Sequence, residues 1–190
     1  MFAFMDCPRV GISRCLLGDE VRYDGTHKRA AALIDALGHH VEWVPVCPEV
    51  EIGMGTPREP IELVARADSV RSAGVQIRML GVSTGEDWTD RMQAWARERL
   101  KALMPLGLSG YVFKARSPSC GIHSVPVHAG DTAHVGRGLF AQALVAALPD
   151  LPVADEEDLA DTAGRDDFLR RIRAYHGRVA CSGSRGPLHE

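Results

Sequence analysis

The stretch SGYVFKARSPSCG, residues 109–121, joins a predicted strand to a stiff turn and is the starting point for the fold. Residues 109–114 are mostly apolar or aromatic and have the length of a strand. The Ser-Pro-Ser sequence that follows is typical of a turn, so Cys120 is expected just beyond the end of the strand. A cysteine in that position is a candidate nucleophile, a metal ligand or an unreactive thiol.

Two earlier segments have the same design. RVGIS, residues 9–13, is followed by Cys15, and VEWVPV, residues 41–46, is followed directly by Cys47. Both segments are short and apolar and contain β-branched residues, which is typical of strands. Each of three predicted strands therefore ends next to a cysteine.

Segments with helical spacing of apolar residues separate these strands. One helix is predicted within residues 26–38, between the first two strands, and another within 87–104, before the third. Strands that alternate with helices predict an α/β fold, here a single domain with a largely parallel central sheet flanked by helices. In such folds the sites lie beyond the carboxyl ends of the strands, so the three cysteines are expected to converge there.

The rest of the chain contributes further elements and a tail. Residues 177–190 lack periodicity and predict a disordered tail, so the domain is expected to span residues 8–176. Apolar patterns predict a strand pair at 61–65 and 74–82, a strand at 124–128, and helices at 138–148 and 166–175.

The composition is that of an ordinary globular protein, because 45% of the 190 residues are hydrophobic and 25% are charged. The net charge of −3 and the scattered arginines disfavour a nucleic-acid partner. No apolar run has the length of a membrane span and no signal peptide is recognised, so we expect a cytoplasmic protein without a membrane partner. The five cysteines, an odd number, suit metal ligands or reactive thiols better than a disulfide framework.

Convergence of three thiolates calls for a cation, because like charges repel, and a metal centre is therefore expected. A structural zinc site commonly uses four ligands in close C-x-x-C pairs, and the sequence contains no such pair. Thiolates from three distant loops suit a cuboidal iron–sulfur cluster with one iron left open. Taken alone, each cysteine is more simply interpreted as an unreactive thiol, and this remains the interpretation of Cys7 and Cys181.

Polar residues beside these cysteines are candidates for catalysis. Glu49 follows Cys47 and Pro48 and is a candidate proton acceptor near the metal, although a surface carboxylate has the same pattern. Ser117 and Ser119 offer hydroxyl groups beside the third cysteine, or stabilise the turn that carries it.

Ser119 and three further residues are candidate substrate contacts. Tyr23 and Lys28 belong to VRYDGTHK, which follows the first cysteine and also reads as a simple turn before a helix. Arg58, in the proline-rich loop GTPREP, is either solvated or placed to clamp an anionic or carbonyl group.

Several blocks in a fixed order resemble the thiouracil desulfurase family, formerly a domain of unknown function. The similarity is greatest to the form found at the amino end of two-domain fusion proteins. The blocks are GISRCLLGDEVRYDGTHK (11–28), VPVCPEVEIGMGTPREP (44–60), SPSCG (117–121), GRGLFAQAL (136–144) and DDFLRRIRAYH (166–176).

The resemblance implies an α/β domain that holds a 4Fe–4S cluster by Cys15, Cys47 and Cys120. It also implies that Glu49 is the catalytic carboxylate and Ser117 the catalytic hydroxyl. The implied reaction converts 2-thiouracil to uracil and releases sulfide by non-redox Lewis-acid chemistry at the open iron. The expected partner is a small thiolated nucleobase or nucleoside.

Two other functions are compatible with the same residues. In the first, Cys120 is the nucleophile of a metal-free enzyme with a histidine as base. In the second, the protein is a non-catalytic iron–sulfur or zinc module that senses redox state or binds RNA. The missing basic stripe disfavours the RNA-binding form of this alternative.

Overall fold

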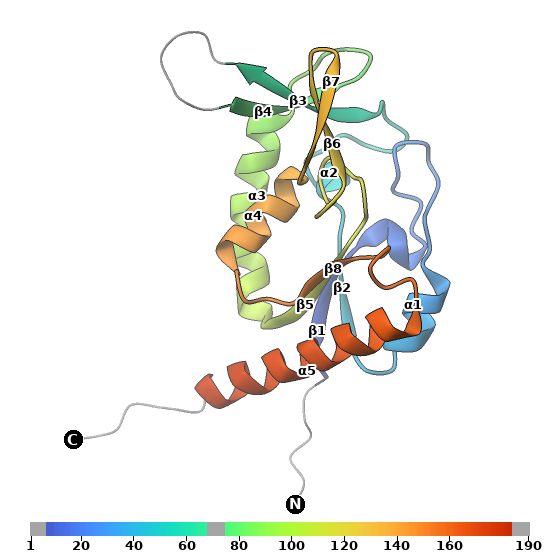
Figure 1. The fold of residues 1–190 in the computed structure, drawn as a ribbon, viewed down its shortest axis with the longest axis vertical. Coiled ribbons are helices and arrows are strands. Elements are labelled where there is room, and N and C mark those ends of the chain that lie inside the picture. The colour runs from blue at the N-terminus through green and yellow to red at the C-terminus, as the bar shows by residue number, and fades with distance from the viewer. Residues whose placement is uncertain (1–6, 68–74, 184–190) are drawn as a thin grey trace, which may run out of the picture.

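The computed structural model describes residues 7–67 and 75–183, which form two sheets and the helices packed on them (Figure 1). The first, sheet A, is four-stranded and parallel, with the order β2-β1-β5-β8. Its predicted strands are β1 (Arg9–Ser13), β2 (Glu42–Val46) and β5 (Leu108–Phe113), and an additional short strand is β8 (Val153–Asp155). The predicted α/β class with a parallel central sheet is confirmed.

The centre of sheet A is closely packed. Every residue of β5 is buried, as expected for a parallel strand covered on both faces. Gly11 of the neighbouring strand allows the ring of Tyr111 to lie against the backbone, because a Cβ atom there would be 2.2 Å from a ring carbon. This contact brings β1 and β5, and therefore the segments that follow them, close together.

The second, sheet B, was not predicted as a separate sheet and has the order β4-β3-β6-β7. The predicted strand pair is confirmed as antiparallel β3 (Ile61–Ala67) and β4 (Val75–Gly81). Strand β6 (Val125–Ala129) pairs in parallel with β3 and antiparallel with β7 (Thr132–Gly136). Strand β7 has no buried residue, so its sequence lacks the apolar alternation that would have predicted it.

Helices cover both faces of sheet A. On one face lie α3 (Thr89–Leu103) and α4 (Leu139–Ala147), and on the other α1 (Ala31–Leu37) and α5 (Thr162–Gly183). The predicted tail boundary at residue 177 is wrong, because α5 continues to Gly183; residues 184–190 lie outside the described part of the chain. The shorter helices are α2 (Pro48–Glu51), η1 (Arg14–Leu17) and η2 (Met104–Leu106).

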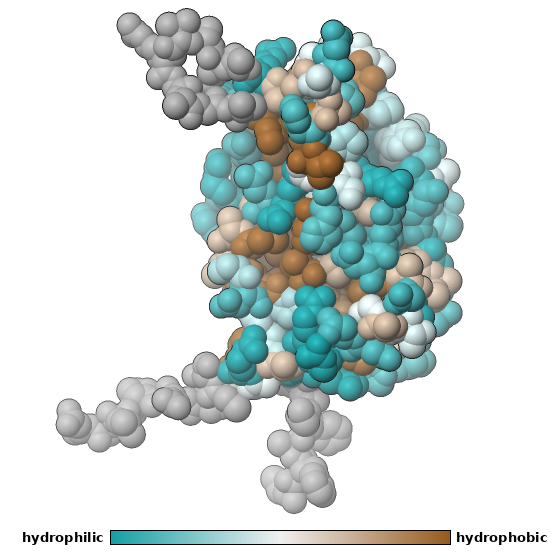
Figure 2. All heavy atoms as spheres, viewed as in Figure 1, coloured by the Kyte–Doolittle hydropathy of each residue, from teal (hydrophilic) through white to brown (hydrophobic). Residues whose placement is uncertain are grey.

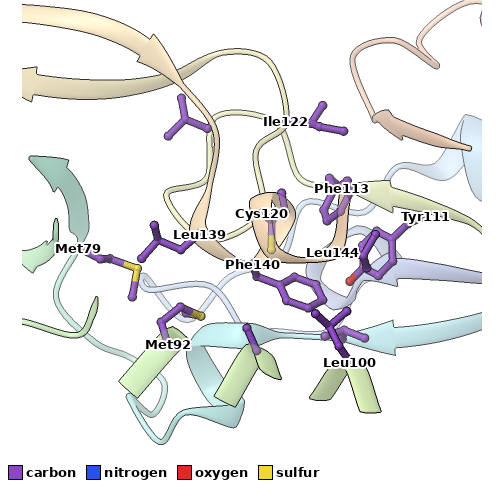
Figure 3. Packing of buried hydrophobic residues seen from close by; sticks show 14 of the residues in the cluster. Met79, Met92, Leu100, Tyr111, Phe113, Cys120, Ile122, Leu139, Phe140 and Leu144 are labelled. Atoms are coloured by element: carbon purple, nitrogen blue, oxygen red, sulfur yellow. The ribbon is translucent and has the colours of Figure 1, made fainter. Parts of the chain in front are cut away.

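The larger hydrophobic core lies between sheet A, α3, α4 and the inner face of sheet B. Tyr111 and Phe113 stack at 4.2 Å between ring centroids, and Phe140 meets both rings edge-on. Figure 3 shows these three rings grouped together with Cys120 beside them. The turn that carries Cys120 is thus anchored in the core.

On the face drawn in Figure 2, the surface is mostly hydrophilic and hydrophobic residues gather over the region of α4.

Candidate active site

A cavity of about 670 Å³ lies at the carboxyl edge of sheet A and is lined by Cys15, Cys47 and Cys120. Cys15 follows β1 in η1, Cys47 follows β2 directly before α2, and Cys120 ends the turn after β5. Strand β1 lies between β2 and β5. The next strand along the chain, β2, pairs on one side of β1, and the later strands β5 and β8 lie on the other side. This switch in strand order is where sites form in open parallel sheets, and the predicted convergence of the three cysteines is observed.

The three thiols are held in a poorly solvated environment. Burial, together with the neighbouring Cys47, raises the pKa of Cys15 to about 12. Burial also raises the pKa of Cys47 and takes that of Cys120 well above its ordinary value. Such thiols are neutral at ordinary pH unless a positive centre stabilises the thiolates.

Glu49 is held in the cavity wall by an ion pair and two hydroxyl groups. Pro48 begins α2 and places Glu49 in its first turn. Arg58 donates to Glu49 Oε2 from Nε at 3.0 Å and from Nη2 at 2.5 Å. The hydroxyl groups of Ser119 and Ser117 donate to Oε1 at 2.9 Å and 3.4 Å. The carboxylate thus has a fixed orientation and is only 15% exposed.

Arg58, the predicted substrate clamp, donates hydrogen bonds to several groups of the protein. Besides Glu49, its Nη1 donates to the carbonyl of Gly55 at 2.8 Å and to Thr56 Oγ1 at 3.4 Å. Its Nη2 also donates to the carbonyl of Val21 at 3.0 Å. All five N–H groups of the guanidinium can therefore be satisfied within the protein. Arg58 orients Glu49, and its side chain is 5% exposed.

The turn Ser117–Gly121 is held by the hydroxyl group of Ser117 and by close packing against the start of helix α4. Ser117 Oγ accepts the backbone N–H groups of Ser119 and Cys120 at 3.3 Å and 3.2 Å. Gly138, just before α4, packs so closely that a Cβ atom would lie 2.5 Å from the carbonyl carbon of Ser119. Ser119, a predicted substrate contact, is fully buried, and its hydroxyl group donates to Glu49.

The remaining predicted contacts lie in the loop at the edge of the cavity. Tyr23 and Lys28 both line the cavity, and Tyr23 is 41% exposed. Arg22 lies over the Tyr23 ring, 5.3 Å from its centroid. The backbone N–H of Lys28 donates to the carbonyl of Cys15 at 3.0 Å, which ties this loop to the first thiol. Both side chains therefore lie in the wall of the cavity.

Sequence reasoning missed a charged pair that also lines the cavity. Lys114 follows β5 directly, Glu156 follows β8 directly, and their side chains form a half-buried ion pair. Lys114 also donates to the carbonyl of Ala115 at 3.0 Å, and Glu156 accepts the N–H of Ala115 at 2.6 Å. Both residues occupy the strand-end position that identified the cysteines, so the same signal would have found Lys114.

The cysteines outside this site are placed differently. Cys7 is exposed and lines a separate, smaller cavity with His176. The side chain of Cys181 lies outside the described part of the chain. Among the described residues, no three His, Cys, Asp or Glu side chains are arranged as ligands of a single metal ion. None of the described helices has the length and apolar character of a membrane span.

These features define an α/β enzyme with a thiol-rich cavity at the carboxyl edge of a parallel sheet. The chain matches the family described as 2-thiouracil desulfurase over residues 10–156. It therefore belongs to the 2-thiouracil desulfurase family and is a desulfurase that acts on a C=S bond, as the sequence blocks predicted.

The chain is also similar to a bacterial protein and to a solved structure. An uncharacterized protein of Bacillus subtilis (strain 168), YbbK, is 34% identical over 111 residues, which are 58% of this chain and 71% of YbbK. A solved structure described as the 4Fe–4S-dependent thiouracil desulfidase TudS is 30% identical. It superposes with a TM-score of 0.61 over 82% of this chain and 95% of its own.

Proposed function

We propose that the protein converts 2-thiouracil, or a nucleoside that contains a thiolated pyrimidine, to the oxo form and releases sulfide. One observation carries the proposal. Thiols from three separate strand ends line the same cavity as a carboxylate, Glu49, whose orientation is fixed by Arg58 and Ser119. Membership of the desulfurase family and the likeness to TudS support the same reaction.

The proposed cofactor is a 4Fe–4S cluster held by Cys15, Cys47 and Cys120. The donor set fits this group, because cysteine thiolates are its usual ligands and the buried thiols need a cation to ionise. The three thiols line one cavity and come from three separate strand ends, as a group that bridges distant loops requires. When bound through three ligands, such a cluster supplies an open iron that acts as a Lewis acid toward a soft thiocarbonyl sulfur.

In this proposal Glu49 is the general base. Water adds to the carbon of the C=S group, and Glu49 Oε1 or Oε2 accepts the proton of that water. The two hydrogen bonds from Arg58 fix the orientation of the Glu49 carboxylate. The carboxylate is therefore held in one orientation toward the water whose proton it accepts. The bond between carbon and sulfur then breaks, a C=O bond replaces it, and the sulfur leaves as sulfide.

Ser117 is proposed to serve the same proton transfer. Its hydroxyl lines the cavity and points to Glu49 Oε1 at 3.4 Å, while its oxygen is held by two backbone N–H groups of the turn. A hydroxyl fixed in this way can pass a proton between the carboxylate and the substrate. Tyr23 and Lys28 are proposed to contact the substrate at the edge of the cavity.

The decisive experiment is anaerobic reconstitution with iron and sulfide, followed by addition of 2-thiouracil and measurement of released sulfide and uracil. We expect Cys15→Ser, Cys47→Ser and Cys120→Ser each to abolish the visible absorbance of the cluster, whereas Cys7→Ser retains it. Glu49→Gln should keep the absorbance and lose about 10²–10⁴-fold in turnover. Glu62→Gln, on β3 and outside the cavity, is the matched control.

The same experiment separates the two alternative functions. A cluster that forms without turnover would leave a non-catalytic iron–sulfur module, for redox sensing or RNA binding. Turnover by Cys15→Ser and Cys47→Ser without a cluster would favour Cys120 as a nucleophile. Burial raises the pKa of Cys120 well above its ordinary value, which leaves little thiolate for a metal-free attack.

A further inference from the structure

Glu51 contacts both backbone polar groups of Cys47, one of the three cysteines in the cavity. It is the last residue of α2, the single turn of helix that begins directly after this cysteine. Its carboxylate oxygen Oε1 accepts the backbone N–H of Cys47 at 3.1 Å. In the other direction, the backbone N–H of Glu51 donates to the carbonyl of Cys47 at 2.9 Å. Because both backbone groups are bound, the sulfur of Cys47 can move mainly by rotation about its Cα–Cβ bond.

The second oxygen of the same carboxylate is paired with a different helix. Arg99 of α3 places its Nε 3.2 Å from Glu51 Oε2, and the two side chains are 28% and 30% exposed. Helix α3 is itself fixed in the larger core, where its residues Met92, Ala96 and Leu100 are buried. Glu51 therefore links a firmly packed helix to the backbone of a residue that lines the cavity.

We propose that Glu51 is a positioning residue that holds Cys47 in place to bind the cluster, and that Arg99 fixes Glu51 in this position. The inference rests on the proposed function, because Cys47 is a ligand only if the protein carries the cluster. Replacement of a residue that orients a metal ligand typically lowers metal affinity by about 10- to 100-fold. The same turn of helix carries Glu49, so the contact also fixes the start of the segment that holds the proposed base.

The test compares Glu51→Ala with Asp87→Ala. Asp87 is a matched control outside the cavity: its carboxylate accepts the backbone N–H of Thr89 at 2.9 Å, at the start of α3, and lies 3.5 Å from Arg78 Nη1. Each variant thus loses a carboxylate that accepts a backbone N–H at a helix start and pairs with an arginine of another element. Two quantities are measured besides turnover. The first is the half-life of the cluster absorbance in an iron chelator, and the second is the hydrogen-exchange rate of the Cys47 amide in protein without the cluster.

We expect Glu51→Ala to lose its cluster about 10-fold faster or more and to exchange the Cys47 amide faster, whereas Asp87→Ala should match the wild type in both quantities. Glu51→Gln should return both quantities toward the wild type, because its amide oxygen can accept the same N–H. Arg99→Met should shorten the half-life less than Glu51→Ala does, because it leaves the bond to Cys47 in place.

Equal half-lives for Glu51→Ala and Asp87→Ala, or an unchanged exchange rate of the Cys47 amide in Glu51→Ala, would overturn the inference. If the wild type forms no cluster, the proposed function itself fails. The exchange rate, measured without the cluster, then still decides whether Glu51 holds Cys47, so the two failures are distinct.

Discussion

Replacement of Arg58 by methionine should both destabilise the protein and disable Glu49. Arg58 is 5% exposed and Glu49 15% exposed, and the two groups share two short N–H···O contacts. Methionine fills a similar volume but removes the charge and every donor. The carboxylate would then remain in a poorly solvated wall with only the hydroxyl groups of Ser117 and Ser119 as partners.

The size of the effect follows from the burial of this pair. Two unit charges about 4 Å apart attract by about 4 kcal/mol at an effective dielectric constant of about 20. Removal of one partner of a buried pair costs about 3–5 kcal/mol, since the other charge is left uncompensated. The exposed pair Arg9–Glu42 has a similar separation of 3.0 Å with side chains 46% and 57% exposed. Arg9→Met should therefore cost less than about 1 kcal/mol.

The assay is a double-mutant cycle on the free energy of unfolding, measured with denaturant on protein without the cluster. Arg58→Met, Glu49→Gln and the double variant are compared, and we expect a coupling energy of about 2–3 kcal/mol. After reconstitution, Arg58→Met should retain the cluster absorbance and lose about 10²-fold in turnover, because Glu49 is misplaced. Additive free energies in the cycle, or full turnover by Arg58→Met, would refute this reasoning.

Two further predictions concern the turn that carries Cys120 and the carboxyl group of Asp155, which accepts the backbone N–H of Ile122 just after that turn. Gly138→Ala should destabilise the protein and shorten the lifetime of the cluster, because its Cβ atom would meet the backbone of Ser119 and Cys120 at 2.5–2.7 Å. As a control, the Cβ atom of Gly177→Ala would meet nothing within 4 Å, so this variant should be neutral or stabilising. Equal unfolding midpoints for the two variants would contradict this prediction. Burial raises the pKa of Asp155 from 3.8 to about 6, so the stability that this group contributes is complete below pH 4 and is lost as the pH rises through 6. The free energy of unfolding of Asp155→Asn relative to the wild type should therefore rise between pH 4 and pH 7, by at most about 3 kcal/mol; a difference that is constant with pH would contradict it.

Three of the four strands of sheet A were predictable because each has a local sequence signal. Strands β1, β2 and β5 are short apolar runs, and parallel strands bring their carboxyl ends to one edge whatever the exact register. Convergence of Cys15, Cys47 and Cys120 could therefore be expected before any coordinates. Strand β8 escaped prediction because it has three residues and takes its stability from pairing with β5. Sheet B escaped as a unit because the pairing of β3 with β6 joins segments far apart in the chain.

By itself, the sequence determined the class of fold, the family and the residue types of the site. The tertiary structure alone decided what the polar residues do. Arg58 and Ser119 look like substrate contacts in the sequence, yet their donors are directed to Glu49. The physical reason is that apolar periodicity is a pattern of residues close together in the sequence. The partner of a hydrogen-bonding group, by contrast, is whichever acceptor the packed chain brings within about 3 Å.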